Sequence, residues 1–268
     1  MRFPTFFISH GGGPWPWMMD DWRGAYDMLA AALRRLPADA GATPTAVLMI
    51  SAHWEEPQFT VQSNPAPGMI YDYGGFPDYT YRISYPAPGA PSLSQRVQEL
   101  LKGAGIAIVD DPQRGFDHGM YAPMAVIYPQ AAMPTVQLSL KRGLDPETHL
   151  ALGRALAPLR DEGVLIIGSG LSYHNLRIFG PAAKQPSADF DGWLGETLGR
   201  TGVARSAALT GWETAPSARQ AHPREEHLLP LMVAVGAAEE EPSLRVYHES
   251  NFFGGISVSN WRFGTPAQ

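Results

Sequence analysis

The segment Thr5-Phe-Phe-Ile-Ser9, followed directly by His10-Gly-Gly-Gly13, indicates the class of fold. A short apolar run that ends in small residues is typical of a buried strand. Three further runs have the same form, at residues 46–51, 135–140 and 164–168. A strand that is apolar throughout needs cover on both of its faces, as strands in parallel sheets have. We therefore expect these runs to form the centre of a largely parallel sheet.

Helical patterns separate the apolar runs. Residues 22–36 place their apolar side chains on one stripe, residues 92–102 begin with a serine cap, and residues 188–200 carry four large apolar side chains. Residues 144–159 open with Asp145-Pro146, a cap followed by proline at the first helical position. Strands that alternate with helices predict an α/β fold. We expect a single domain over residues 1–268, with a central, largely parallel mixed sheet flanked by helices on both faces.

Three other segments have patterns of their own. Residues 62–91 are rich in proline, glycine and tyrosine, which predicts a long irregular excursion that forms a lid or a substrate wall. Residues 178–187, with two prolines, predict a loop ahead of the fourth helix. Residues 244–263 alternate in polarity around Asn251-Phe-Phe-Gly-Gly255 and predict a C-terminal hairpin.

Composition and charge exclude several classes of function. The net charge of −6 is spread along the chain without a basic run, so we expect no nucleic-acid partner and no anionic membrane surface. No apolar stretch approaches the roughly 20 residues of a membrane span, and the N-terminus lacks the long apolar core of a secretory signal. The absence of cysteine excludes thiolate metal sites and fits a reducing compartment. We therefore expect a soluble, cytoplasmic protein.

Four of the eight histidines stand where a strand ends or a helix begins: His10, His53, His174 and His227. In open α/β sheets the ligand site lies beyond the carboxyl ends of the strands, so these side chains are expected to converge. His174 comes shortly after residues 168–170, for which Gly-Ser-Gly predicts a flexible turn. Imidazole is a common ligand of zinc and iron and also titrates near neutral pH. The pattern predicts a metal site with its own proton-handling group.

Each histidine, taken alone, also fits a structural role. His118 follows Asp117 in a turn-like segment, where the carboxylate could fix its tautomer or hold an imidazolium. Glu225 and Glu226 precede His227 and are candidate ligands, although acidic residues also compensate the dipole of a helix start. His149 and His248 are expected to be structural or solvent-facing, and His222 is expected to lie outside the helix that follows it. Without a GxSxG elbow, an HExxH motif or a cysteine, acyl transfer without a metal is disfavoured.

The sequence resembles the class III extradiol ring-cleavage dioxygenases, within them the 4,5-DOPA dioxygenase-like branch. Seven motifs carry the resemblance, in the family's order and over nearly the whole chain. They are Ser9-His-Gly-Gly, Ser51-Ala-His-Trp54, Tyr73-Gly-Gly-Phe-Pro77, Tyr85-Pro-Ala-Pro-Gly89, Gly115-Phe-Asp-His-Gly119, His174-Asn-Leu-Arg177 and Glu226-His-Leu-Leu-Pro-Leu231. Each motif alone is weak, but the ordered set is specific.

The resemblance implies a role for each of the five candidate histidines. The metal would be held by His10, His53 and His227, while His174 would act as catalytic acid and base, with a further ligand role left open. His118 would line the same pocket and help to bind or protonate the substrate. The implied reaction inserts both atoms of O2 into a small catechol, DOPA-like or related, beside its hydroxyls. Fe2+ is the implied working metal, and Zn2+ is implied for the purified form.

Two other functions use the same residues and remain open at this stage. A zinc-dependent hydrolase would use the histidines to activate water, and a metal-binding or aromatic-binding protein would need no catalysis. Arg82, Arg114 and Arg177 are candidates to meet a carboxylate on the substrate. A monomer and a homodimer are both compatible with the sequence.

Overall fold

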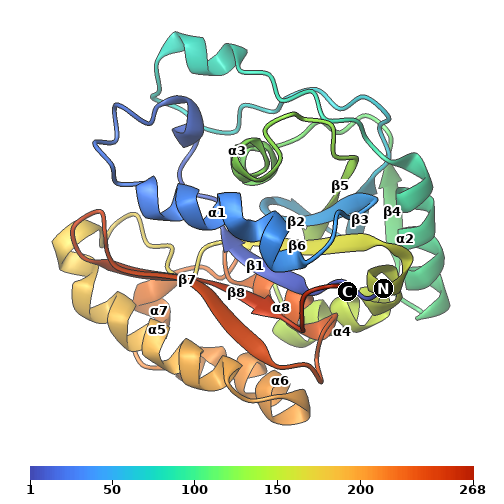
Figure 1. Ribbon diagram of the computed structural model, residues 1–268. Coiled ribbons are helices and arrows are strands. Elements are labelled where there is room, and N and C mark those ends of the chain that lie inside the picture. Colours follow the sequence, from blue (N-terminus) through green and yellow to red (C-terminus); the bar gives the residue numbers. More distant parts are fainter.

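The computed structural model describes all residues from 1 to 268. Eight strands form one mixed sheet at the centre of the fold (Figure 1). The strands are β1 (Thr5–Ser9), β2 (Ala46–Glu56), β3 (Phe59–Gln62), β4 (Ile108–Asp111), β5 (Thr135–Lys141), β6 (Val164–Gly170), β7 (Ser243–Phe252) and β8 (Ile256–Phe263). Their order is β4-β3-β5-β2-β6-β1-β8-β7. β5, β2, β6 and β1 pair in parallel, whereas β8 pairs antiparallel with both β1 and β7. The predicted parallel centre and the C-terminal hairpin are confirmed.

Helices cover both faces of this sheet, as the alternating pattern predicted. They are α1 (Asp27–Ala40), α2 (Pro91–Gly103), α3 (His118–Ile127), α4 (Pro146–Leu156), α5 (Lys184–Leu198), α6 (Gly202–Thr210), α7 (Ala218–Ala221) and α8 (Leu229–Gly236). Short 3-10 helices lie at Trp15–Trp17, Asp78–Arg82, Ala157–Glu162, Gly180–Ala183 and Trp212–Thr214. α1 and α3 lie on one face, α4 to α8 on the other, and α2 lies beside the edge strand β4 (Figure 1). No helix has the length and apolar content to cross a membrane.

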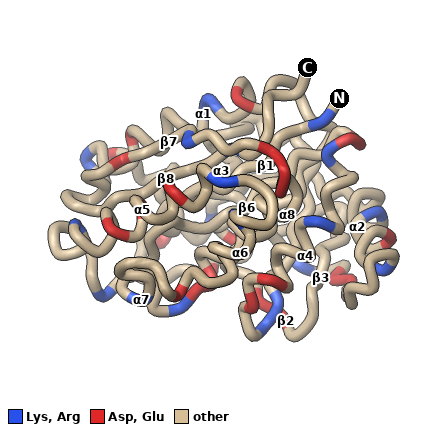
Figure 2. Tube along the Cα trace, turned by 90° about the horizontal axis from the view of Figure 1, so that it is seen from below, with Lys and Arg blue, Asp and Glu red and all other residues tan.

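Burial is complete in three elements next to the site. Every residue of β1, β6 and α8 is buried, because the central strands lie between helices and α8 packs against them. A side chain on Gly168 would overlap the carbonyl oxygen of Pro230, so this glycine permits the close approach of α8 to β6. Figure 2 shows basic and acidic residues interspersed along the trace, as the mixed charge pattern of the sequence implies.

Several element boundaries differ from the sequence-based expectations. Residues 168–170 are not a flexible turn but the end of β6, because they pair with β1 while α8 covers their face. The first helix begins at Asp27 rather than residue 22, since Arg23 and Gly24 have positive φ angles of 49° and 82°. Residues 178–187 are partly helical, because α5 begins at Lys184. The excursion at residues 62–91 is irregular, as expected, apart from its ends and one 3-10 helix.

Candidate metal centre and active site

A cavity of about 460 Å³ opens beside the carboxyl ends of β1 and β6, and all five candidate histidines line it. His10 follows the last residue of β1, and its backbone N–H donates to the carbonyl of Gly170 at 3.1 Å. His174 lies four residues beyond the end of β6, and His118 is the first residue of α3. The structure therefore brings together every histidine that the sequence singled out for the site.

His53 and His227 reach the cavity by routes that differ from the expectation. β2 does not end at residue 51 but continues to Glu56, with a shift of pairing register between Ile50 and Glu55. His53 lies inside that irregular stretch, where a bulge can re-aim a side chain. His227 lies two residues before α8 rather than within its first turn, and its carbonyl accepts from the N–H of Leu171 at 3.0 Å.

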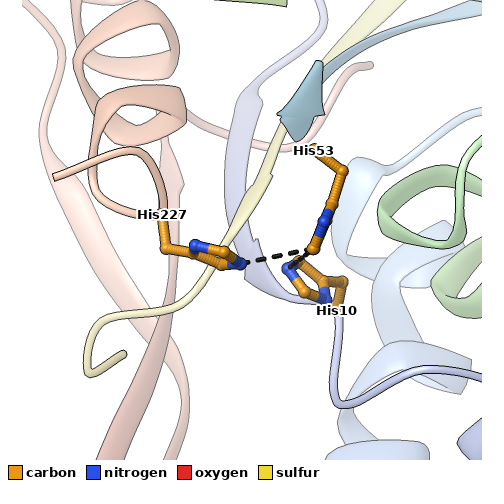
Figure 3. A group of neighbouring side chains, drawn as sticks. All are labelled: His10, His53 and His227. Atoms are coloured by element: carbon orange, nitrogen blue, oxygen red, sulfur yellow. Dashed lines mark hydrogen bonds between the residues drawn. The ribbon is translucent and has the colours of Figure 1, made fainter. Parts of the chain in front are cut away.

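Three imidazole Nε2 atoms point toward one another from separate elements (Figure 3). The Nε2 of His53 lies 3.3 Å from the Nε2 of His10 and 3.3 Å from the Nε2 of His227. Burial, with the neighbouring imidazoles, holds the pKa of His10 and of His227 well below the usual range and lowers that of His53 to about 4. All three rings are therefore neutral near pH 7 and present lone pairs. This donor set fits a divalent transition metal.

Two carboxylates link the predicted metal ligands to the other two histidines of the cavity, His118 and His174. Asp72 lies 2.8 Å from Nδ1 of His118 and 3.3 Å from Nδ1 of His53. Glu226 lies 2.9 Å from Nδ1 of His227 and 3.2 Å from Nδ1 of His174. A carboxylate on Nδ1 fixes the tautomer and leaves Nε2 free to act.

Both carboxylates are held in their charged form. Burial opposes ionisation of Asp72, but its hydrogen bonds with His118 and its electrostatic interaction with the His118 and His53 rings outweigh burial and lower its pKa. The same balance lowers the pKa of Glu226, where the hydrogen bond with His174 is the main opposing contribution. Glu226 therefore acts here as a partner of two imidazoles, while Glu225 forms an ion pair with Arg219 at 2.6 Å.

The expected partner of His118 was wrong. Asp117 does not contact the His118 ring but accepts from Ser51 Oγ at 2.7 Å and from Gln137 Nε2 at 2.8 Å, and it pairs with Arg114. These bonds tie the start of α3 to β2 and β5. Asp72 takes the predicted role instead, although it lies 46 positions away from His118. The one available signal was its place beside the Tyr73-Gly-Gly-Phe-Pro motif.

The other three histidines lie outside the cavity. His149 is buried in α4, where Nδ1 donates to Asp145 and Nε2 accepts from the N–H of Lys141. His222 is buried between α7 and α8, and its Nε2 donates to the carbonyl of Ser172 at 3.1 Å. His248 on β7 lies 3.1 Å from Ser259 Oγ.

Aromatic and aliphatic side chains form much of the remaining cavity wall, and the sequence indicated only those of the excursion at residues 62–91, which was predicted to form a lid or a substrate wall. Trp22 and Tyr26 come from the segment ahead of α1 and Phe76 from the irregular excursion. Phe252 is the last residue of β7, and Phe253 lies in the turn that leads to β8. Such a wall suits a planar, apolar ligand. The glycines at residues 11–13 also line it, and a side chain on Gly13 would overlap the Phe76 ring.

Comparison with known proteins gives one consistent result. Residues 4–264 match the family described as the catalytic LigB subunit of aromatic ring-opening dioxygenase. The chain is 41% identical over 265 residues to the 4,5-DOPA dioxygenase extradiol of Beta vulgaris, covering 97% of this chain and 96% of that one. It is 32% identical over 268 residues to the 4,5-DOPA dioxygenase extradiol of Escherichia coli, covering 98% and 95%.

A solved structure is also similar over the full length. The crystal structure of an uncharacterized protein from Escherichia coli K12 has a TM-score of 0.79 and 28% sequence identity, covering 98% of this chain and 100% of that one. The match of the family to nearly every residue agrees with the single sheet and with the one cavity that all five candidate histidines line. The chain belongs to the family of catalytic LigB subunits of aromatic ring-opening dioxygenases and is an extradiol ring-cleavage enzyme with a metal cofactor.

Proposed function

We propose that this enzyme cleaves the ring of a catechol beside its hydroxyls and inserts both atoms of O2, with Fe2+ held by His10, His53 and His227. The observation that carries the proposal is the convergence of three neutral imidazole nitrogens in a cavity with an aromatic wall. Three protein ligands leave further positions for substrate and O2. When bound, Fe2+ supplies the redox chemistry that couples oxidation of the catechol to reduction of dioxygen.

His174 is the proton carrier in this proposal. Its Nδ1 faces Glu226, so its Nε2 is the atom available to the substrate. We assign to Nε2 the removal of a proton from the second catechol hydroxyl and the return of that proton to the opened ring. Its ring stacks on that of His227, with centroids 3.4 Å apart, which keeps the proton carrier beside the ligand set.

His118 also binds the substrate in the same scheme. Asp72 accepts from Nδ1 of His118, and the His118 ring lies 3.9 Å from that of His53 between centroids. Its Nε2 is thereby available to hold or protonate a catechol oxygen. Two acid–base groups on separate elements, α3 and the segment after β6, would orient the ring before it reacts.

The names of the relatives support the substrate class. The proteins from Beta vulgaris and Escherichia coli are named for DOPA, which is a catechol. The family description names aromatic ring opening. A zinc hydrolase would use the same three imidazoles, and oxygen dependence separates the two functions.

Metal reconstitution tests the proposal. Protein stripped of metal is loaded anaerobically with Fe2+ or with Zn2+, mixed with a panel of catechols, and exposed to air in an oxygen electrode. We expect oxygen uptake and a new near-visible absorbance with Fe2+ and neither with Zn2+. Turnover of a lactone or amide by the zinc form without oxygen would support the hydrolase instead. Catechol binding without oxygen uptake by the fully iron-loaded protein would leave only a binding function.

A further inference from the structure

The wall of the cavity carries no fixed charge. None of its lining residues is lysine, arginine, aspartate or glutamate, and its titratable groups are the five histidines and three tyrosines. The five histidines account for the metal-binding and acid–base groups of the wall. Much of the remaining wall is apolar, with Leu171, Phe252, Ile256 and Val258 all buried. A carboxylate or ammonium group placed there would lose its hydration without gaining a partner.

The polar side chains of the wall are already engaged within the protein. Tyr73 and Tyr173 donate their hydroxyl protons to backbone carbonyls at 2.7 Å and 2.6 Å, and Tyr26 accepts from the N–H of Gly12 at 3.0 Å. The amide of Asn175 donates to one backbone carbonyl and accepts from the N–H of Arg177. The hydroxyl proton of Tyr26 and one amide N–H of Asn175 remain free, but both are uncharged, so the wall offers no ion pair to an amino-acid side chain on a substrate.

The arginines that the sequence offered as carboxylate partners do not line the cavity. Arg114 lies over the ring of Trp54, 4.2 Å from its centroid, and pairs with Asp117. Arg82 lies exposed in the 3-10 helix of the excursion. Arg177 is exposed and follows a residue of the wall without being part of the wall.

Apolar side chains also surround the mouth of the cavity. Leu176 and Phe179 belong to the wall although they are 75% and 42% exposed. A ligand that fills the cavity would contact both side chains and remove their apolar surface from water. Phe179 packs against Phe253, with ring centroids 5.1 Å apart, so the two aromatic rings form one side of the mouth.

Phe253 adopts a backbone conformation that aromatic residues rarely have. Its φ angle is +48°, in the left-handed region, at the turn between β7 and β8. Glycines follow at positions 254 and 255 and would adopt that conformation without cost. Strain of this kind persists where surrounding contacts enforce it, and it gathers at ligand sites. Here the contacts are with Trp22, Tyr26 and Phe179, which hold the ring in the cavity wall.

We propose that the substrate is a catechol with an uncharged, apolar or aromatic substituent, which lies against Leu176, Phe179 and Phe253, rather than a catechol with an amino-acid side chain. This inference rests on the proposed ring cleavage, because it places the catechol hydroxyls at the histidines. A cavity of about 460 Å³ has room beyond a single ring, since pockets of this size hold drug-sized ligands. Phe253 is then the residue that determines specificity for the substituent.

Binding can be measured without turnover. Under anaerobic conditions, the Fe2+-loaded protein is titrated with 4-phenylcatechol, 4-butylcatechol, DOPA and 3,4-dihydroxyphenylpropionate, and quenching of tryptophan fluorescence is followed, since Trp22 lines the cavity. We expect the two apolar catechols to bind at least ~10-fold more tightly than the two charged ones, because each buried methylene strengthens binding. The same ranking is expected for kcat/KM in air.

Variants at the mouth sharpen the test. Phe253→Gly removes the ring and relieves the left-handed strain, and we expect it to lower the preference for apolar catechols about 10-fold. Leu176→Arg places a cation at the mouth and should improve binding of the carboxylated catechols. Leu244→Ala is the matched control, because Leu244 is 51% exposed on β7 and lies outside the cavity. It should leave the ranking unchanged.

Two outcomes overturn the inference, and only the second also overturns the proposed ring cleavage. DOPA bound and cleaved as well as the apolar catechols would overturn the preference, and its loss in Arg177→Ala would show that an arginine captures the carboxylate. The inference would then fail while ring cleavage stands. If no catechol binds or is cleaved by iron-loaded protein, the proposed function fails and takes the inference with it.

Discussion

At the scale of single residues, the same arrangement occurs twice in the site: a carboxylate, Asp72 or Glu226, lies between two imidazole rings. Each carboxylate contacts Nδ1 of one histidine assigned to the metal and Nδ1 of one histidine assigned to proton transfer. The proton carriers are thereby fixed relative to the ligands, and every Nε2 is left free for metal or substrate. His10 is the exception, because its Nδ1 is buried without a partner.

Replacing His174 tests the assigned proton carrier. We expect His174→Gln to lower kcat by about 10²- to 10⁴-fold, because general acid–base catalysis contributes that much. Anaerobic binding of catechol should change little. His248→Gln is the control, since His248 lies on β7 outside the cavity and should tolerate the change. An unchanged kcat would argue against the acid–base role, and parallel losses of metal content and kcat would instead indicate a ligand.

Asp72 is expected to position two histidines without touching the substrate. Asp72→Asn keeps the shape of the side chain but removes the charge beside His53 and His118. We expect metal affinity or kcat to fall by about 10- to 100-fold, as loss of such a partner typically causes. Metal affinity is measured by competition with a chelator. Asp78→Asn, exposed in the same excursion, should be neutral, and equal effects of the two variants would contradict the positioning role.

At the scale of elements, β2 and α8 decide where the ligands lie. β2 extends past its apolar run with a shift in pairing, which places His53 in the cavity. α8 is apolar on all sides and buried, so it can approach β6 only where glycine removes the side chain. The segment that carries His227 enters α8 and is therefore positioned by this helix–strand contact.

Gly168 tests that contact. In Gly168→Ala the added methyl would overlap the Pro230 carbonyl, and overpacking of this kind costs about 1–3 kcal/mol of unfolding free energy. Gly192→Ala in α5 is the control, because nothing lies within 4 Å of the added methyl, and it should stabilise the helix by ~0.5–1 kcal/mol. Urea unfolding measures both variants. A neutral Gly168→Ala would show that α8 can shift freely.

His149 predicts a pH dependence of stability. Burial, opposed by its bond to Asp145, lowers its pKa from 6.5 to about 4. The unfolded chain therefore binds a proton first as the pH falls, so the stability from neutral His149 is complete above pH 6.5 and is lost between pH 6.5 and 4. The loss is about 1.4 kcal/mol per pH unit. The unfolding free energy of His149→Gln should fall less steeply in this window, and parallel curves for the two proteins would contradict the assignment.

At the scale of the whole molecule, the sheet order brings together residues from all parts of the chain. β1 lies between β6 and β8, so the first and last strands are neighbours, and the chain ends lie close together (Figure 1). The apolar runs were sufficient to predict the four central strands, and the rule for strand ends explains why His10 and His174 reach the cavity. His53 and His227 reach it from an irregular stretch inside β2 and from the segment before α8, which that rule did not predict. The family motifs added His118, whose spacing alone did not separate a structural from a functional role.

The remaining features depend on contacts that no local pattern contains. β4 is largely exposed and lacks the apolar run of the central strands, and β3 has only four residues. Asp72 acquires its role through His118, which is 46 residues away, and Phe253 acquires its conformation through Trp22 and Phe179. Long-range packing determines these features, so the partners of a site are harder to predict than its ligands.

The fate of dioxygen tests the central claim most directly. Iron-loaded protein is allowed to turn over a catechol that it binds under ¹⁸O2, and the ring-opened product is trapped and analysed by mass spectrometry. Insertion of both atoms predicts two labelled oxygens in each product molecule. The aldehyde oxygen of the product can exchange with water, and reduction of the aldehyde prevents this exchange. A product with no label from ¹⁸O2, and with label from H2¹⁸O instead, would show hydrolysis and contradict the account.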